Sequence, residues 1–235
     1  MRVTRWATRG AAAGTVAVLA APLGYRIGGI VPLGPAFLLL AGGVLLIAVS
    51  AGVLGARMAR GTGPRDRTSW AALVAAVAVG AVPLATLVSS LGAPPIHDVT
   101  TDTENPPAFV AAVALNTPGR TDYEGPGLAE RQRAAYPDLG PAELSVAPAD
   151  AFRRALAVVQ RMGWELLATD PDSLRIEATD RSFWFGFEDD VVIRIAADGE
   201  SGSRVDVRSL SRVGVGDLGV NARRVREFLD ALAEE

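Results

Sequence analysis

The sequence predicts a membrane-anchored protein: an α-helical N-terminal part with three spans, followed by a soluble α+β domain with an antiparallel sheet. Three observations predict this fold class. Long apolar runs occupy the first 91 residues. The charge then changes sign, because residues 1–91 carry eight Arg and one acidic residue, whereas residues 92–235 carry 15 Arg and 25 Asp or Glu. The last third alternates apolar and polar residues at strand period between two segments of helical period.

The apolar runs have the length that a membrane-crossing helix requires, about 20 residues. No charged residue lies between Arg26 and Arg57, nor between Arg67 and Asp98. The first run is shorter, and the apolar region of a cleaved signal peptide is the alternative for it. We expect residues 1–91 to form a transmembrane anchor with spans at about 10–27, 35–55 and 70–91.

The basic residues predict the orientation of these spans. Three Arg precede the first span, and the segment between the second and third spans carries Arg57, Arg60, Arg65 and Arg67. The other loop carries only Arg26. The positive-inside rule therefore places the N-terminus in the cytoplasm and the C-terminal domain outside it, at a cell inner (plasma) membrane. Because the spans contain no ionisable residue, we interpret them as an anchor and not as a transport pathway.

The remaining chain divides into a linker and a domain. Residues 92–147 are rich in Pro and Gly and lack periodicity, so we expect an extended linker wrapped on the domain. Residues 148–235 form the predicted α+β domain. Its first helix begins at Pro148 and keeps apolar residues at helical spacing to Met162, and Asp217 is suited to cap the second helix. Between the helices, short turns favour an antiparallel sheet of four to five strands with the helices packed on one face.

The strands are expected at residues 164–169, 174–179, 183–187, 191–196 and 204–210. Side-chain alternation places Ile176 and Ile193 on the helix-covered face and a mixture of Arg and carboxylates on the other. The second face is either a solvated ladder of ion pairs or an Arg-lined platform for an anion or a partner. The candidate partner surface consists of Arg175, Trp184, Arg194 and Asp206.

Five blocks of sequence carry a family resemblance: PPIHDVTTDTENPPAF, AAYPDL, MGWELL, RIEATDRSFWFGFEDDVVIRI and VDVRSLSRVGVGDLGVNARRVREFL. Together they resemble a widespread bacterial family known as domain of unknown function 1499, over about residues 94–232. The resemblance implies either N-terminal spans or export, and it implies no established activity. The segment VGVG is richer in Gly than the family pattern.

Gly214, Gly216 and Gly219 form the pattern G-x-G-x-x-G between a strand and a helix. A dinucleotide site needs a second parallel strand with an acidic residue about 20 positions later. The 16 residues after Gly219 continue the final helix. We therefore expect no nucleotide and interpret the glycines as a flexible lead into the helix.

The segment around these glycines is the candidate ligand-binding site, because free amides at a helix N-terminus favour anions. Its residues are Arg208, Ser209, Ser211, Arg212, Asp217 and Asn221. The alternative is structural: Asp217 caps the helix, Asn221 satisfies loop carbonyls, and Arg212 pairs with a strand carboxylate.

A weaker candidate is a metal site. His97 is the only histidine, and Asp98 and Asp102 follow it closely. One imidazole with carboxylates is an unusual zinc site. We expect no cofactor, and a metal at these residues would instead indicate an envelope hydrolase or another metal-dependent enzyme.

Composition narrows the function classes. With no Cys the chain has no disulfide and no thiol nucleophile, and a net acidic outer domain disfavours nucleic acid. The partners we expect are the lipid bilayer and either an envelope protein or an anionic ligand. The favoured hypothesis is a non-enzymatic binding or assembly module; the alternatives are the hydrolase and an anion or lipid-headgroup binder that uses Arg208 and Arg212.

Overall fold

The computed structural model describes residues 2–27, 29–62, 67–89 and 92–235. The chain separates into two compact units: residues Met1–Leu91 with Phe183–Gly186, and residues Gly92–Ser182 with Phe187–Glu235. Arg65, which helped to predict the orientation of the spans, and residue 91, the predicted end of the third span, lie outside the described residues.

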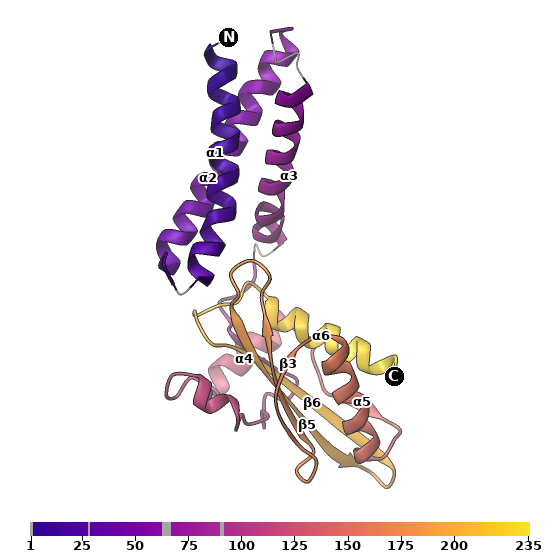
Figure 1. Cartoon of the computed structure of the whole chain (residues 1–235). Coiled ribbons are helices and arrows are strands. Elements are labelled where there is room, and N and C mark those ends of the chain that lie inside the picture. The colour runs from indigo at the N-terminus through magenta and orange to yellow at the C-terminus, as the bar shows by residue number, and fades with distance from the viewer. Residues whose placement is uncertain (1, 28, 63–66, 90–91) are drawn as a thin grey trace. The chain divides into compact units, whose positions relative to one another are not determined.

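The first unit contains three long helices that run side by side: α1 (Arg2–Arg26), α2 (Leu33–Ala59) and α3 (Arg67–Ser89) (Figure 1). Helices α1 and α2 touch through their backbones at Gly14 and Gly43. A Cβ atom on Gly14 would lie 2.7 Å from the carbonyl oxygen of Gly43, so neither helix can carry a larger residue there without moving apart. Small residues at such crossings are typical of helices that associate in lipid.

Two helical segments in the described ranges have the length and composition to cross a membrane, Leu33–Ala59 and Ser69–Thr86. The prediction of three spans is therefore supported for two. Helix α1 forms as a long helix, but only the residues between Arg9 and Arg26 are uncharged, and that stretch is shorter than the roughly 20 residues a span needs.

The second unit is built on an antiparallel sheet of six strands. The strand order is β1-β6-β5-β4-β3, and β2 pairs with the same edge of β6 as β1. The strands are β1 (Asp98–Thr100), β2 (Ala142–Leu144), β3 (Glu165–Asp170), β4 (Arg175–Arg181), β5 (Glu188–Asp198) and β6 (Gly202–Ser211).

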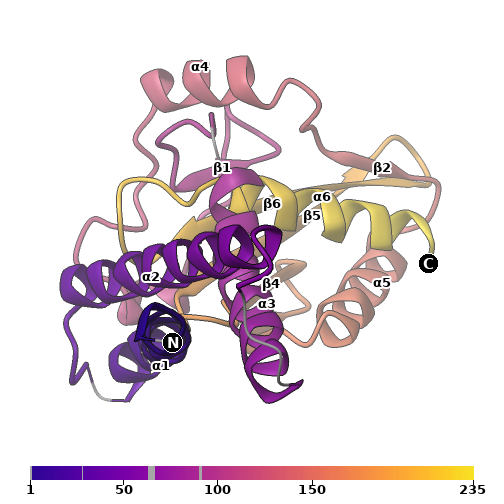
Figure 2. The same cartoon turned by 90° about the horizontal axis from the view of Figure 1, so that it is seen from above.

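The main core lies between this sheet and helices α5 (Pro148–Arg161) and α6 (Val220–Ala233). Both helices cover one face, as the alternation predicted, and Figure 2 shows them beside β5 and β6. The buried strand residues on this face include Ile176, Ala178, Val191, Ile193, Ile195, Val205 and Val207.

Residues 183–187 are not a strand, contrary to the prediction. Strands β4 and β5 pair up to Arg181 opposite Glu188, so the aromatic segment is the turn of a hairpin. The amide of Ser182 donates to the carbonyl of Phe187, and the amide of Phe187 donates to the Ser182 hydroxyl. These two hydrogen bonds close the turn.

The predicted linker belongs to the second unit and adds regular structure to it. It contributes β1, β2, the 3-10 helix η1 (Ala112–Leu115) and helix α4 (Pro126–Ala135). Helix α4 lies at the β1 edge of the sheet (Figure 2). There the buried amide side chain of Gln132 accepts from the Thr100 amide at 3.0 Å and donates to the Thr100 carbonyl at 2.6 Å. One side chain thereby replaces the missing neighbour strand at this edge.

Candidate functional site

The sheet face away from α5 and α6 is covered by residues 101–124, which we call the cover segment. Phe109 and Ala112 of this segment pack on Val192 and Leu210 of the sheet in a small second core. The face predicted to be solvated is therefore largely internal. Its charged residues must be paired, because burying an isolated charge is costly.

The most deeply buried pair joins Arg208 of β6 to Asp98 of β1. The guanidinium donates from Nε and Nη2 to the two carboxylate oxygens at 2.9 and 2.7 Å. It also donates to the carbonyls of Pro107 and Thr121, which both belong to the cover segment. Arg208, predicted as a ligand-binding residue, thus has internal partners at each of its three nitrogens.

A second group of charges lies farther along β5 and β6. Asp206 accepts from Arg194 at 2.9 Å and from Arg204 at 3.1 Å, and Asp102 of the cover segment contacts the same two guanidiniums. Asp206 is buried. Its carboxylate is therefore engaged inside the domain, and a role of Asp206 in a partner surface stays a prediction.

Two further carboxylates hold the cover segment at η1. The oxygens of Glu177 accept the amides of Val110 and Ala112 at 2.9 and 3.0 Å. Asp190 accepts from the side-chain amide of Asn116 at 2.7 Å. The negative charges of the sheet thus bind backbone and side chains of a segment about 70 residues away in the sequence.

Arg212, at the end of β6, binds carboxylates of β5. It donates to Asp190 at 2.7 and 2.9 Å and to Glu188, and also to the Thr179 hydroxyl. The hydrogen bonds to Asp190 raise the pKa of Arg212. This geometry matches the structural alternative for Arg212, in which a strand carboxylate is its partner.

Ser209, Ser211 and Asn221 meet between β6 and the first turn of α6. The Ser209 hydroxyl donates to Asn221 Oδ1 at 2.7 Å, and Asn221 Nδ2 donates to the Ser211 hydroxyl and to the His97 carbonyl. Asp217 accepts the amides of Gly219 and Asn221, so it caps α6 although the helix begins at Val220. Burial raises the pKa of Asp217. Four of the six candidate ligand-binding residues thus form one internal polar cluster.

Sequence reasoning missed Arg224, a buried residue of α6. Asp180 and Asp189 face each other across β4 and β5, and like charges in that position repel. Arg224 donates to both, at 2.9 and 2.7 Å, and also to Ser209. The opposed pair of carboxylates was the available signal, because such a pair requires a cation.

The candidate metal residues are not brought together. Asp98 is paired with Arg208, and Asp102 with Arg194 and Arg204. His97 Nε2 lies 3.6 Å from Glu124. Over the described ranges, no group of three or more His, Asp or Glu side chains is placed to hold a metal. The guanidiniums occupy the carboxylate oxygens that a cation would need.

His97 and Arg120 instead support the loop 212–219, which we call the glycine-rich loop. Arg120 donates to the carbonyls of Ser211 and Gly214 at 2.7 Å, and His97 is hydrogen-bonded to the backbone of Val215. Burial, followed by the charge of Arg120, lowers the pKa of His97.

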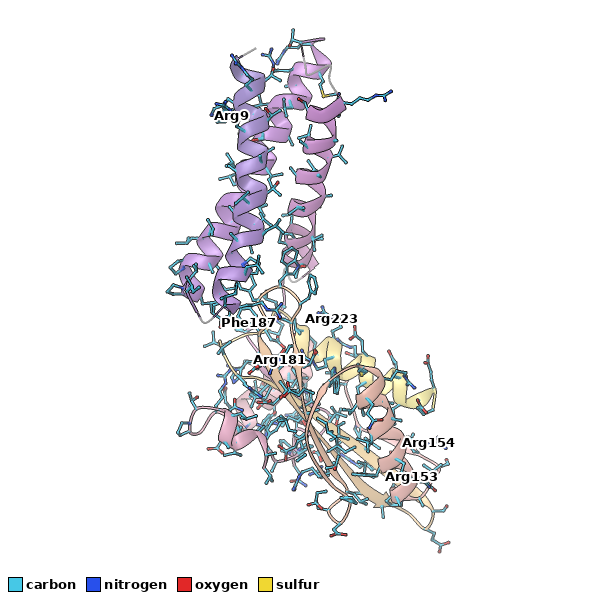
Figure 3. The ribbon with its side chains drawn as sticks, in the orientation of Figure 1. Arg9, Arg153, Arg154, Arg181, Phe187 and Arg223 are labelled. Atoms are coloured by element: carbon cyan, nitrogen blue, oxygen red, sulfur yellow. The ribbon has the colours of Figure 1, made fainter. Side chains whose placement is uncertain are left out.

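Figure 3 shows Arg181, Phe187 and Arg223 at one end of this unit, and Arg153 and Arg154 at the other.

Of the other predicted partner residues, Arg175 of β4 is the cross-strand partner of Arg194 of β5, and Arg194 is the cross-strand partner of Asp206 of β6. Arg175 on β4 contacts Asp170 and Glu177 at 3.4 Å. Arg194 belongs to the group around Asp206. Trp184 lies in the turn after β4, with its ring edge-on to Phe183 at 5.9 Å between centroids. Arg175, Arg194 and Asp206 thus form one row across β4, β5 and β6, and Trp184 lies outside this row.

A small pocket of about 270 Å³ lies beside the N-terminus of α4. It is lined by Thr103, Glu104, Pro106, Tyr123, Gly125, Pro126, Ala129 and Arg133. Within the described part of the chain, the buried Tyr123 hydroxyl has no hydrogen-bond partner. Burial raises the pKa of Tyr123 to about 12, so the hydroxyl remains a donor at neutral pH. Neither Tyr123 nor this pocket was identified from the sequence.

The comparisons with known proteins give a family and no activity. A family model described as "Protein of unknown function (DUF1499)" matches residues 98–232. The match begins at the first residue of β1 and ends within α6, so it covers the sheet, the cover segment and both packing helices. No curated protein matches the chain.

Proposed function

This chain belongs to the DUF1499 family of proteins of unknown function, and from that premise we propose that it is a membrane-anchored, non-enzymatic binding or assembly module. Its α+β domain lies outside the cytoplasm, at the cell envelope, and its N-terminus lies inside. This orientation requires α1 to cross the membrane in addition to α2 and α3, because two crossings alone would leave the N-terminus and the domain on the same side. The observation that carries the proposal is the ion-pair network beneath the cover segment. In this network Asp98 pairs with Arg208, Asp102 with Arg194, and Arg212 with Glu188 and Asp190.

Fixed charge pairs suit a scaffold better than a reactive centre. A general acid or base needs a proton-exchanging group within reach of a substrate. The carboxylates of this face are instead saturated by guanidiniums and backbone amides. The domain therefore offers other molecules its exposed loops and helix surfaces.

The membrane anchor is supported by the outward side chains of α2 and α3. Leu38, Leu45 and Val74 are exposed, which is unfavourable in water and favourable in lipid. The orientation is supported by the Arg-rich segments at the N-terminus and after α2.

The two alternatives from the sequence have less support. A hydrolase using His97, Asp98 and Asp102 would need these side chains to converge, and Arg208 and Arg194 hold the two carboxylates elsewhere. An anion binder using Arg208 and Arg212 would have to displace their internal carboxylates. Breaking buried pairs of this kind costs about 3–5 kcal/mol, more than a weak ligand supplies.

Single cysteines test on which side of the membrane each segment lies, because the natural chain contains no cysteine. Glu200→Cys lies in the exposed turn between β5 and β6, and Thr62→Cys is exposed after α2. We expect an impermeant maleimide to label Glu200→Cys in intact cells, and Thr62→Cys only after permeabilisation. The reverse pattern would overturn the proposed orientation.

Photo-crosslinking in the native membrane tests the binding role. A photoreactive residue at Val110, an exposed apolar position of the cover segment, should give a discrete crosslinked product. Arg153 on the outer side of α5 is the matched exposed control (Figure 3). Failure of Val110 and of other exposed apolar positions to crosslink above this control would count against a protein partner.

The pocket beside α4 favours a second candidate, the binding of a small polar molecule. Its basis is the place of Tyr123 in the pocket lining, with a buried hydroxyl that has no hydrogen-bond partner among the described residues. Tyr123→Phe removes that donor and keeps the ring against Arg208. If the pocket binds a co-purifying molecule, native mass spectrometry should show it on the natural protein and not on this variant.

A further inference from the structure

The glycine-rich loop lies at the end of the domain where the chain arrives from α3. The amide of Ser211 donates to the His97 carbonyl, and the amide of Asp217 donates to the Ile96 carbonyl. A Cβ atom on Gly216 would lie 3.0 Å from the Cα atom of Pro95. The loop is therefore packed directly on residues 95–97, the lead into β1.

The turn between β4 and β5 belongs to the same end of the sheet. The Arg212 amide donates to the Glu188 carbonyl at 3.1 Å, so the glycine-rich loop leaves β6 next to the first residue of β5. The turn closed by Ser182 and Phe187 precedes that residue and has the sequence FWFG. Arg223 of α6 lies at this end as well (Figure 3).

The glycine-rich loop exposes apolar side chains that have no role in the core. Val213, Val215 and Leu218 are 45%, 80% and 53% exposed. Single exposed apolar residues are common, but three within six positions of one loop form a patch of the kind that binds another surface. The backbone of the loop is nevertheless held in place by His97 and Arg120.

Leu218 is exposed in a conformation that disfavours it. Its φ is 59°, in the left-handed region, where a residue with a Cβ atom costs about 1–2 kcal/mol. Asp217 holds the next amides and fixes this geometry. A strained backbone that directs a leucine into solvent, where glycine would be easier to accommodate, indicates a use for the side chain outside the fold.

The charge of this patch suits an anionic surface. Arg120 binds the loop through carbonyls, and no salt bridge is formed by its guanidinium among the residues described. The carboxylate of Asp217 is directed to backbone amides of α6. Apolar tips next to an Arg are typical of segments that enter the interface of a membrane with anionic lipids. The charge of Arg120 is partly balanced by Asp98 and Glu124.

We propose that Val213, Val215 and Leu218 of the glycine-rich loop insert into the headgroup region of the membrane that the chain itself crosses, with Arg120 at their base. The proposal rests on the proposed membrane anchor. Helix α3 ends at Ser89 and β1 begins at Asp98. Only eight residues of sequence, 90–97, therefore join the proposed span to the end of the domain that carries the loop. The loop orients the domain and leaves the cover segment free for a partner.

The test uses the full-length protein in liposomes that contain anionic lipid and lipid with brominated acyl chains. Single cysteines at Val215 and Leu218 carry a small fluorophore. The matched controls are Val113→Cys, an apolar residue of similar exposure in η1, and Glu200→Cys, at the opposite end of β5 and β6. We expect the brominated lipid to reduce the fluorescence of Val215→Cys and Leu218→Cys and to leave both controls unchanged.

Alkaline carbonate washing distinguishes a failure of the proposed loop contact from a failure of the proposed membrane anchor. Protein that stays in the liposomes but shows no quenching at either loop position would overturn the loop contact and leave the anchor intact. Equal quenching at all four positions would also overturn it, because the contact would not be specific to this loop. Protein extracted by carbonate would overturn the anchor and with it the membrane contact.

Discussion

Arg208 and Asp98 form a bidentate ion pair whose side chains are 3% and 1% exposed. The two residues are 110 positions apart and belong to β6 and β1. The same guanidinium binds carbonyls of the cover segment and stacks over Phe109, with 4.9 Å from Cζ to the ring centroid. Arg208 therefore joins three separate stretches of the chain, and its loss would affect all of them.

Arg208→Ala should lower the free energy of unfolding by about 3–5 kcal/mol, because it leaves the Asp98 carboxylate buried without a partner. Urea denaturation of the full-length protein in detergent measures this. Arg153→Ala is the control, since its pair with Asp150 is exposed and contributes at most about 1 kcal/mol. Similar effects of the two substitutions would contradict the structural role assigned to Arg208.

Gln132→Ala should expose the edge of β1. The variant leaves the Thr100 amide and carbonyl without partners, and each unsatisfied buried group costs about 1–3 kcal/mol. Hydrogen exchange at the Thr100 amide should become faster than in the natural protein. Gln160→Ala, at an exposed position of α5, should leave that rate unchanged. An unchanged Thr100 rate in Gln132→Ala would mean that another group protects this edge.

Leu218→Gly should retain or increase stability, although it removes a large side chain. Relief of the left-handed conformation is worth about 1–2 kcal/mol, and the added freedom of the unfolded chain offsets about 0.5–1 kcal/mol of it. Val215→Gly in the same loop gains no such relief and should destabilise. Thermal unfolding measures the stability of both variants. A larger decrease in melting temperature for Leu218→Gly than for Val215→Gly would argue against backbone strain at Leu218.

His97 should make stability depend on pH. Burial, and then the charge of Arg120, keep the pKa of the folded-state imidazole below its ordinary value of 6.5. The unfolded chain then binds the proton more readily, so the contribution of His97 is complete above pH 6.5 and declines as the pH falls through the lower folded pKa. Melting temperatures between about pH 7.5 and 5.5 should fall less in His97→Gln than in the natural protein. Parallel curves would show that His97 is not the titrating group.

The sequence was most informative where burial repeats along a continuous element. Strands β4 to β6 and helices α5 and α6 present one face to the core over six or more residues, so their alternation or helical spacing is visible without the fold. Strands β1 and β2 have three residues each, too few for a period. Their existence depends on the neighbouring β6.

The candidate site shows the same limit. The sequence identified Arg208, Arg212 and Asp217 as residues with a specific role, because charges and a capping residue stand out at the end of a strand. It did not identify Asp98 as the partner of Arg208, or Asp190 as the strand carboxylate that pairs with Arg212. Asp98 and the cover segment reach Arg208 only through the pairing of β1 with β6, and Tyr123 joins the pocket only when α4 packs at the edge of the sheet.

The sequence by itself thus determined the apolar N-terminal helices, the antiparallel sheet and the two helices on one of its faces, because these follow from local periodicity and composition. Tertiary structure alone decided that the charged face is internal, since the burial of a charge depends on a segment about 70 to 110 residues away. It also decided which apolar residues remain exposed. Val215 and Leu218 look like any loop residues in the sequence, and only the packing of the loop on residues 95–97 leaves their side chains in solvent at the end of the domain nearest α3 along the chain.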